Sequence, residues 1–199
     1  MKVKKMEIIF ICDGETDYKF IEKMFKEDKE LNKLGIRAIK PEDVGLKRRQ
    51  GGGHKTLLKD ASFAAMKAAQ GFADGVFVLV DNDCDKRFVF PHNSCNGCRE
   101  CEAIDTLNKI KWGKPFCKDA SILYQAIETL ILSAKRKMTP QEEDMLCSKQ
   151  LKTALYGKEP KKQQEHYELF IIELNNINTN NIQARSYNRL KQKVKNIVQ

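Results

Sequence analysis

Acidic residues follow two apolar runs of this 199-residue chain. Asp13 comes after the run from Met6 to Cys12 (MEIIFIC). Asp81 and Asp83 come after the run from Val76 to Val80 (VFVLV). Both runs are short and nearly continuous, which predicts strands buried on both faces. Because the carboxyl ends of parallel strands form the ligand-binding edge of a sheet, neighbouring strands would bring these three carboxylates together.

Clustered carboxylates favour a bound divalent cation. Without a cation the charges repel one another and the carboxyl pKa values rise, whereas a bound ion removes that cost. Mg²⁺ suits such a site because it takes oxygen ligands, keeps several waters and can share substrate phosphates. We therefore expect Asp13, Asp81 and Asp83 to bind Mg²⁺, or Mn²⁺ in its place, for phosphoryl-transfer chemistry. Asp85 is a further acidic residue after the second run.

A second candidate metal site lies between residues 92 and 101. Four soft or borderline ligands follow one another in the pattern His-x2-Cys-x2-Cys-x2-Cys: His92, Cys95, Cys98 and Cys101. This spacing predicts a structural zinc site, in which the ligands fill the coordination sphere and leave no water to activate. An iron–sulfur cluster with Cys84 or Cys117 as its fourth ligand is an alternative. Reduced cysteines without a metal are another.

The chain is strongly basic, with a formal net charge of +9 and a pI of about 9.1. Such a charge favours polyanions such as nucleic acid, although a lysine-rich solvated surface would give the same total. The segment from Gly45 to Lys59 is basic and contains no acidic residue. We expect four of its side chains to contact a nucleic-acid backbone: Lys47, Arg48, Arg49 and Lys55. The alternative is a mobile loop with a basic flank.

The C-terminal segment, residues 183–199, is basic as well. Its apolar residues recur at helical spacing, which predicts a helix that docks through one stripe: Tyr187, Leu190, Val194 and Ile197. Its basic residues are expected to face no acidic residue: Arg185, Arg189, Lys191, Lys193 and Lys195. The pattern favours a docked helix with a solvated basic face over a dedicated nucleic-acid-binding helix.

The other segments predict the elements that position these residues. Apolar residues fall at helical spacing after the first run, and residues 57–73 are rich in alanine and leucine, which also predicts a helix. Residues 35–39 predict a strand that Pro41 ends, and residues 121–133 predict a short strand that runs into a helix. Strands that alternate with helices indicate an α/β fold with a parallel sheet flanked by helices.

Two parts of the chain differ from this α/β pattern. Residues 87–118 hold three closely spaced cysteines and few apolar runs, which predicts a loop-rich, cysteine-rich insertion. From Thr139 onward the chain has a helical character, and Thr139 followed by Pro140 is a typical helix start. We therefore expect an α/β domain over residues 1–135, with the insertion inside it, and a helical C-terminal extension over residues 136–199.

The two units of strand and carboxylate resemble the Toprim domain of topoisomerases, primases and OLD-family nucleases. ICDGETDYKFIEKMF resembles the first Toprim motif, with Asp13 where a Glu is usual and with Glu15 close by. VFVLVDNDCD resembles the second motif and contains Asp81, Asp83 and Asp85. The resemblance therefore implies that these carboxylates form a Toprim metal site.

A later segment extends the resemblance. SILYQAIETLIL resembles a part of stand-alone, OLD-like Toprim proteins in which a Glu precedes an apolar helix, and Glu128 matches that Glu. The resemblance covers roughly residues 6–135 and implies a nuclease that uses one or two Mg²⁺ ions to hydrolyse DNA or RNA. It makes Glu15, Asp85 and Glu128 candidates for a second metal or for positions behind the first. Relatives of this kind also imply a partner ATPase, encoded nearby, in a bacterial defence-type system.

Two other functions stay open at this point. One is a non-catalytic module with a Toprim fold that binds nucleic acid or an ATPase partner, and the other is a zinc-stabilised adaptor with no nucleic-acid role. The apolar runs are too short to cross a bilayer or to form a secretory signal, so we expect no membrane association. Seven cysteines without such a signal indicate reduced thiols and a cytoplasmic protein.

Overall fold

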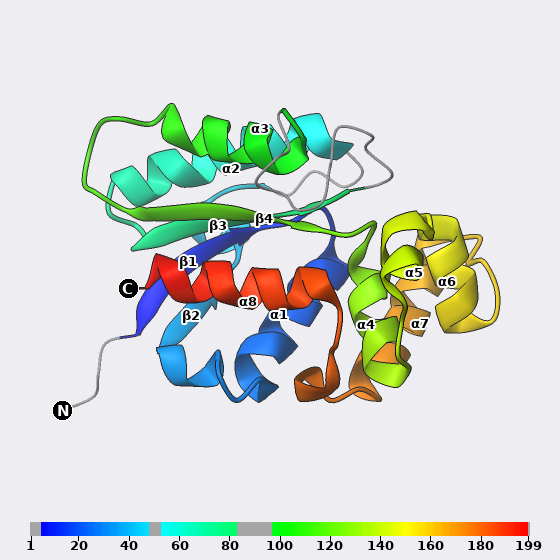
Figure 1. The fold of residues 1–199 in the computed structure, drawn as a ribbon. Helices are drawn as coiled ribbons and strands as arrows, with labels where there is room; N and C mark the ends of the chain where they lie inside the picture. Colours follow the sequence, from blue (N-terminus) through cyan, green and yellow to red (C-terminus); the bar gives the residue numbers. More distant parts are fainter. Residues whose placement is uncertain (1–4, 48–52, 83–96, 199) are drawn as a thin grey trace.

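The structure is a computed structural model that describes residues 5–47, 53–82 and 97–198. In this part of the chain, parallel strands form one sheet in the order β2-β1-β3-β4 (Figure 1). The strands are β1 (Met6–Ile11), β2 (Ile36–Ile39), β3 (Gly75–Asp81) and β4 (Cys117–Leu123). The predicted α/β fold with a parallel sheet is therefore confirmed.

The two apolar runs form neighbouring central strands, as the site prediction requires. β1 pairs with β3 in parallel, with Ile8 opposite Gly75 and Ile11 opposite Val78. Gly75 sits at a close approach of β3 to β4, since a Cβ at this position would lie 2.8 Å from the Cys117 carbonyl oxygen. A larger residue there would push β4 away from β3.

Helices cover both faces of the sheet (Figure 1). α2 (Gly53–Ala69) and α3 (Arg99–Asn108) pack on one face. α1 (Glu15–Glu27) and α8 (Arg185–Ile197) pack on the other. Side chains alternate along a strand, so Ile9 and Val78 join the core under α2, whereas Ile8 and Phe77 join the core under α1. Burial on both faces explains why the central strands read as continuous apolar runs.

Shorter helices complete the α/β part. The 3₁₀ helices η1 (Asn32–Leu34) and η2 (Pro41–Val44) flank β2. After β4 the chain turns into α4 (Ile127–Lys135), so the predicted strand that runs into a helix is present. None of the helices in the described ranges is long and apolar enough to span a bilayer.

The prediction of a loop-rich segment over residues 87–118 is wrong in its second half. Residues 99–108 form α3, and β4 begins at Cys117. Parallel strands need a long crossover connection, and α3 supplies it between β3 and β4. Ala103 and Leu107 lie one helical turn apart and are both buried against the sheet. The predicted cysteine-rich insertion is otherwise untested, because residues 83–96 lie outside the described residues.

The chain after α4 is mostly helical, as predicted. It forms α5 (Pro140–Met145), α6 (Ser148–Tyr156), α7 (Gln163–Asn175), η4 (Thr179–Asn181) and α8. The predicted start of α5 is confirmed, since the Thr139 hydroxyl accepts a hydrogen bond from the Glu142 amide (3.2 Å). The division after residue 135 stays a prediction, and α8 shares the core of the sheet.

α8 docks through the predicted stripe, but its basic residues contact acidic residues of the same chain. The four stripe residues are buried: Tyr187, Leu190, Val194 and Ile197. The expectation that the basic residues face no acidic residue is wrong. Each one forms an ion pair: Arg185 with Glu143 and Asp144, Arg189 with Glu100, Lys191 with Asp28, Lys193 with Glu100 and Asp119, and Lys195 with Glu30. These acids come from segments far away in sequence, so the composition of the helix could not reveal them.

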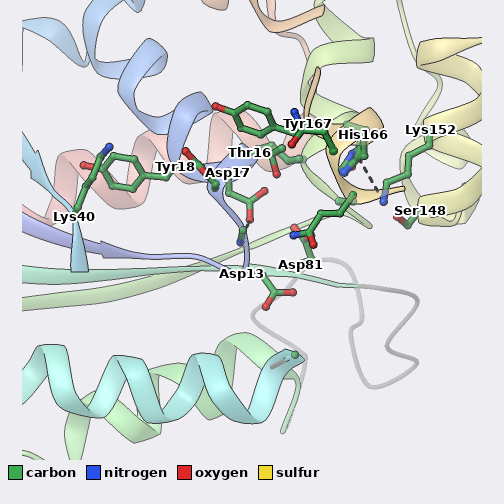
Figure 2. Close-up of a pocket in the computed structure, with 18 of the residues that line it drawn as sticks. Asp13, Thr16, Asp17, Tyr18, Lys40, Asp81, Ser148, Lys152, His166 and Tyr167 are labelled. Atoms are coloured by element: carbon green, nitrogen blue, oxygen red, sulfur yellow. Dashed lines mark hydrogen bonds and ion pairs between the residues drawn. The ribbon is translucent and has the colours of Figure 1, made fainter. Parts of the chain in front are cut away.

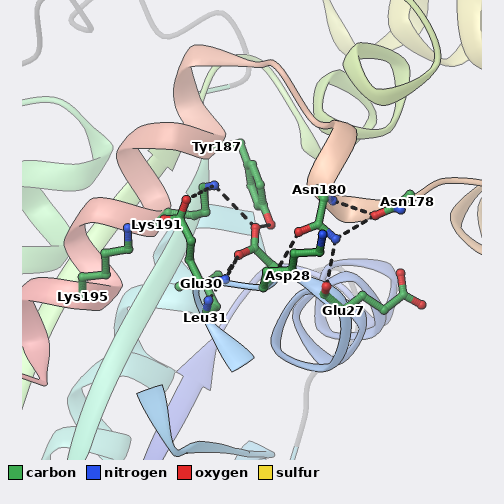
Figure 3. Close-up of polar contacts among 10 residues, drawn as sticks. Glu27, Asp28, Glu30, Leu31, Asn178, Asn180, Tyr187, Lys191 and Lys195 are labelled. Atoms are coloured by element: carbon green, nitrogen blue, oxygen red, sulfur yellow. Dashed lines mark hydrogen bonds and ion pairs between the residues drawn. The ribbon is translucent and has the colours of Figure 1, made fainter. Parts of the chain in front are cut away.

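Asp28 anchors one end of this network (Figure 3). The Tyr187 hydroxyl donates a hydrogen bond to Asp28 Oδ2 (2.8 Å), and the Glu30 and Leu31 amides donate to Oδ1 (2.9 and 3.2 Å). Burial raises the pKa of the Asp28 carboxyl, but these hydrogen bonds and the charge of Lys191 outweigh it, so the pKa lies below its usual value. Asp28 therefore stays ionised and ties α8 to the end of α1.

Glu100 anchors the other part of the network, at the edge strand β4. Its carboxylate is fully buried and accepts a hydrogen bond from the Ile122 amide (2.7 Å). Arg189 Nη2 donates to Oε1 (2.6 Å), and Lys193 Nζ lies 2.8 Å from the same oxygen. Burial raises the pKa of Glu100, but Arg189 and Lys193 together lower it by more than burial raises it, so the net shift is downward. The cluster covers the free edge of the sheet and joins α3 to α8.

We expect Glu100→Gln to destabilise the protein strongly. Glutamine keeps the size of the side chain but leaves Arg189 and Lys193 without their buried counter-charge, and such a loss costs about 3–5 kcal/mol. Denaturant unfolding at neutral pH measures the change. The matched control is Glu159→Gln, which breaks an exposed ion pair with Lys149 and should change little.

The contribution of Glu100 to the free energy of unfolding should depend on pH. A folded-state pKa below the unfolded value contributes stability above the unfolded pKa, and this contribution is lost as the pH falls through the folded pKa. The stability difference between wild type and Glu100→Gln should therefore be largest at neutral pH and shrink in acid. A difference that stays constant into acid, or that is no larger than the control's, would contradict the role of Glu100.

Candidate functional site

A pocket of about 1220 Å³ opens at the carboxyl edge of the sheet (Figure 2). It lies between the turn from β1 to α1, the end of β3, the first turn of α4 and the two helices α6 and α7. Several carboxylates line it near the strand ends and the helix starts that follow them: Asp13, Glu15, Asp17, Glu42, Asp81 and Glu128. Lysine, histidine and other polar side chains line it from the helices beyond: Ser148, Lys152, Gln163, Gln164, His166 and Tyr167.

Strand pairing brings Asp13 and Asp81 to this pocket. Ile11 lies opposite Val78, and the two aspartates follow these partners by two and three residues. Asp13 is exposed and Asp81 is half-buried, so both carboxylates can be reached from the pocket. Asp83 and Asp85 lie outside the described residues.

The start of α1 fixes the turn that carries Asp13. The Asp17 carboxylate accepts a hydrogen bond from the Gly14 amide (2.8 Å), which closes the first turn of the helix. Asp17 is buried, whereas Glu15 is exposed beside the pocket. Glu15 is therefore better placed than Asp17 to reach a ligand.

The Glu128 carboxylate is buried at the pocket and contacts two side chains from the helices beyond it. Its side chain is only 2% exposed, and His166 Nε2 lies 2.8 Å from Oε1. Lys152 Nζ lies 3.9 Å from the same oxygen. A buried carboxylate with two positively charged or polar partners is compensated, so Glu128 positions these partners rather than standing open to a ligand.

Helices α6 and α7 bring His166 and Lys152 to the pocket, and the sequence did not single out either residue. The His166 ring packs edge-on against Tyr156 and Phe170, with centroids 5.8 and 6.4 Å away. Burial, followed by the nearby charges of Glu128 and Glu173, raises the pKa of the Tyr156 phenol, so this group keeps its proton. The aromatic contacts and the Glu128 carboxylate together hold the imidazole in one orientation.

The carboxylates in the described ranges fit a hard divalent cation. Among the described residues, no three His, Cys, Asp or Glu side chains meet closely enough to hold one ion. Mg²⁺ is usually held by one or two carboxylates, with water and substrate phosphate in the other positions. Asp13 and Asp81 match that donor set.

Half of the predicted zinc ligands lie in the described residues. Cys98 precedes the first residue of α3, Cys101 lies in its first turn, and their sulfur atoms are 3.7 Å apart. Two thiolates on a tetrahedral zinc ion, each bonded at about 2.3 Å, lie about 3.8 Å apart. The two sulfurs are thus spaced as zinc requires, and His92 and Cys95 lie outside the described residues.

Cys117 cannot complete an iron–sulfur cluster with these cysteines. It begins β4 opposite Gly75, at the amino edge of the sheet. Glu100, which is next to Cys101, contacts the Ile122 amide instead. Ile122 lies five residue steps along β4 from Cys117, a span of roughly 17 Å. Cys84, the other candidate, lies outside the described residues.

The predicted basic loop is only partly described. Lys47 and Lys55 are exposed, whereas Arg48 and Arg49 lie outside the described residues. Gly53, the first residue of α2, lines the pocket. The described flank of the loop therefore ends beside the pocket, where a bound backbone could be contacted.

Comparison with known proteins does not assign this chain to a family. No protein-family model matches it, and neither the curated proteins nor the solved structures give a match.

A double-mutant cycle tests the contact between Glu128 and His166. We expect Glu128→Gln and His166→Gln to show a coupling of about 1–3 kcal/mol in the free energy of unfolding, because the two groups are in contact and one is buried. Lys149 and Glu159 form an ion pair of similar length (2.9 Å) on the surface and serve as the control cycle. Equal coupling in the two cycles would show that burial adds nothing to the Glu128 contact.

Proposed function

We propose that this protein is a metal-dependent phosphoryl-transfer enzyme that hydrolyses phosphodiester bonds in nucleic acid. One observation carries the proposal: Asp13 and Asp81 follow adjacent parallel strands and line the same pocket. Carboxylates fixed at the ends of rigid strands are suited to hold Mg²⁺ or Mn²⁺. A cation bound there would neutralise the charge that builds up on a phosphodiester during cleavage.

The charges on the other wall of the pocket support an anionic substrate. Figure 2 shows Lys152 and His166 reaching the pocket from the helices, whereas Asp13 and Asp81 reach it from the strand ends. Lys152 is partly buried, with 28% of its side chain exposed, so its charge acts in a medium that water screens incompletely. A phosphate between the two walls would meet a cation held by carboxylates on one side and an ammonium group on the other.

The Toprim resemblance points to the same chemistry. Its motifs supply the two aspartates and Glu128, and all three residues line the pocket. We infer from the resemblance that DNA or RNA is the substrate and that a partner ATPase controls the activity. Asp13 in place of the usual Glu shortens the carboxylate by one methylene, so the first motif is the point at which this chain departs from the family pattern.

We also propose that zinc stabilises the start of α3. Cys98 and Cys101 would bind the ion with His92 and Cys95, and the site would hold the chain close to the end of β3. The contact from Arg99 Nη1 to the Asp81 carbonyl oxygen (3.0 Å) links this helix start to the catalytic edge. The zinc ion would therefore help to hold Asp81 in place and would take no part in the reaction.

Cleavage assays test the enzyme proposal. With Mn²⁺, wild-type protein should cleave at least one of three substrates: plasmid, single-stranded DNA or structured RNA. Asp81→Asn should abolish cleavage, because the amide cannot replace a carboxylate ligand, and should leave the melting temperature unchanged or raised without metal. Asp105→Asn, an exposed change on α3, is the control.

Asp13→Glu sharpens this test. If Asp13 is a shortened form of the family Glu, the variant should keep or increase activity, whereas Asp13→Asn should lose it. If wild type and Asp81→Asn are equally inactive on every substrate, with the partner ATPase added, the chain is instead a non-catalytic module of the same fold.

Metal analysis tests the zinc proposal separately. Protein purified without chelator should contain about one zinc ion per chain, and Cys98→Ser with Cys101→Ser should lose it. Iron with acid-labile sulfide, or no metal in the wild-type protein, would overturn the assignment.

A further inference from the structure

A second surface lies at the amino edge of the sheet, away from the pocket. It is formed by the turn after α2 (residues 70–74) and by residues 109–118, which lead into β4 and include its first two residues, and we call it the amino-edge surface. The two segments abut, because the Lys114 amide donates a hydrogen bond to the Ala69 carbonyl oxygen (2.7 Å). Gly113 has a φ of +84°, and a Cβ there would lie 2.4 Å from the same oxygen. Figure 1 shows both segments at the end of the sheet opposite α5, α6 and α7.

Two large aromatic side chains are exposed on the amino-edge surface. Phe72 is 57% exposed and Trp112 is 52% exposed. Neither belongs to the two buried cores, so their exposure is not explained by folding. Exposed aromatic side chains surrounded by polar residues commonly mark a binding surface.

The segments that carry these two aromatic residues are rich in lysine. Five lie on the two segments or on the last turn of α2: Lys67, Lys109, Lys111, Lys114 and Lys118. In the part of the chain that the structure describes, none of them forms an ion pair with a carboxylate. Lys67 Nζ instead lies 4.7 Å from the centroid of the Phe72 ring.

The contrast with α8 identifies which positive charge can act on a partner. Every basic residue of α8 named above is neutralised by a carboxylate of the same chain. The lysines of the amino-edge surface are not, so a share of the net charge of +9 is displayed there beside the exposed aromatic rings.

We propose that the amino-edge surface binds single-stranded nucleic acid. Unpaired bases stack on exposed aromatic side chains, and each such contact contributes about 1–3 kcal/mol, while lysines bind the phosphates. A duplex has its bases stacked internally and would use only the lysines. Charge complementarity and exposed rings together favour a single strand over a duplex.

The position of this surface gives it a role distinct from the pocket. β3 begins at Gly75 beside the amino-edge surface and ends at Asp81 in the pocket, which puts the two sites roughly 20 Å apart. Bases stacked at the amino-edge surface therefore lie beyond the reach of the candidate metal ligands. The inference stands whether or not the pocket cleaves nucleic acid, because it concerns binding alone.

Trp112 makes the test direct, because it is the only tryptophan of the chain. Titration of the full-length protein with a single-stranded thymidine oligonucleotide, without divalent metal, should quench the tryptophan fluorescence. Binding of a labelled oligonucleotide, followed by anisotropy, should weaken at least tenfold in Lys111→Glu with Lys114→Glu and should show a smaller salt slope. Trp112→Ala and Phe72→Ala should each weaken binding at constant salt slope, because stacking releases no counterions.

The control variant is Lys33→Glu with Lys137→Glu, which makes the same change in charge at two exposed lysines elsewhere. Equal weakening in this control would overturn the proposal, since it would show a non-specific response to net charge. So would an absence of quenching at low salt, or a fluorescence change with vesicles of anionic lipid but none with the oligonucleotide, which would make the surface a membrane contact. The titration is made without divalent metal, so a failure of the enzyme proposal can be told apart from a failure of this one.

Discussion

The parallel pairing of β1 with β3 is the constraint on which the candidate site depends. Both strands are buried on both faces, so their apolar side chains fix the register at Ile11 opposite Val78. A shift by one residue would turn every side chain to the other face of the sheet. The register in turn sets where Asp13 and Asp81 leave the strands, so the hydrophobic core determines the position of the two carboxylates.

Ion pairs at the edge of the sheet hold the remaining layers around this pair of strands. Glu100 joins α3, β4 and α8, and Asp28 ties α8 to the end of α1. These contacts turn the basic face of α8 inward, which removes it as a surface for nucleic acid. The amino-edge surface and the described flank of the basic loop, Lys47 and Lys55, are among the places where exposed lysines remain available to a partner.

The sequence predicted what local pattern determines and missed what distant segments determine. The β1 and β3 strands, the stripe of α8 and the start of α5 follow from spacing and composition, and all are present. α3 was missed because it is short and begins within the run of closely spaced cysteines, which hid a helical face of Ala103 and Leu107. His166 and Lys152 gave no signal, because only the packing of α6 and α7 brings them to Glu128.

The central claim is that two strand ends form a site for a divalent cation. A crystal of the wild-type protein grown with Mn²⁺ and measured at the manganese absorption edge tests it without any assumption about substrate. The account predicts an anomalous peak within bonding distance of carboxylate oxygens of Asp13 and Asp81, and no such peak in Asp81→Asn crystals. A wild-type map with manganese bound elsewhere and none at this pocket would contradict it.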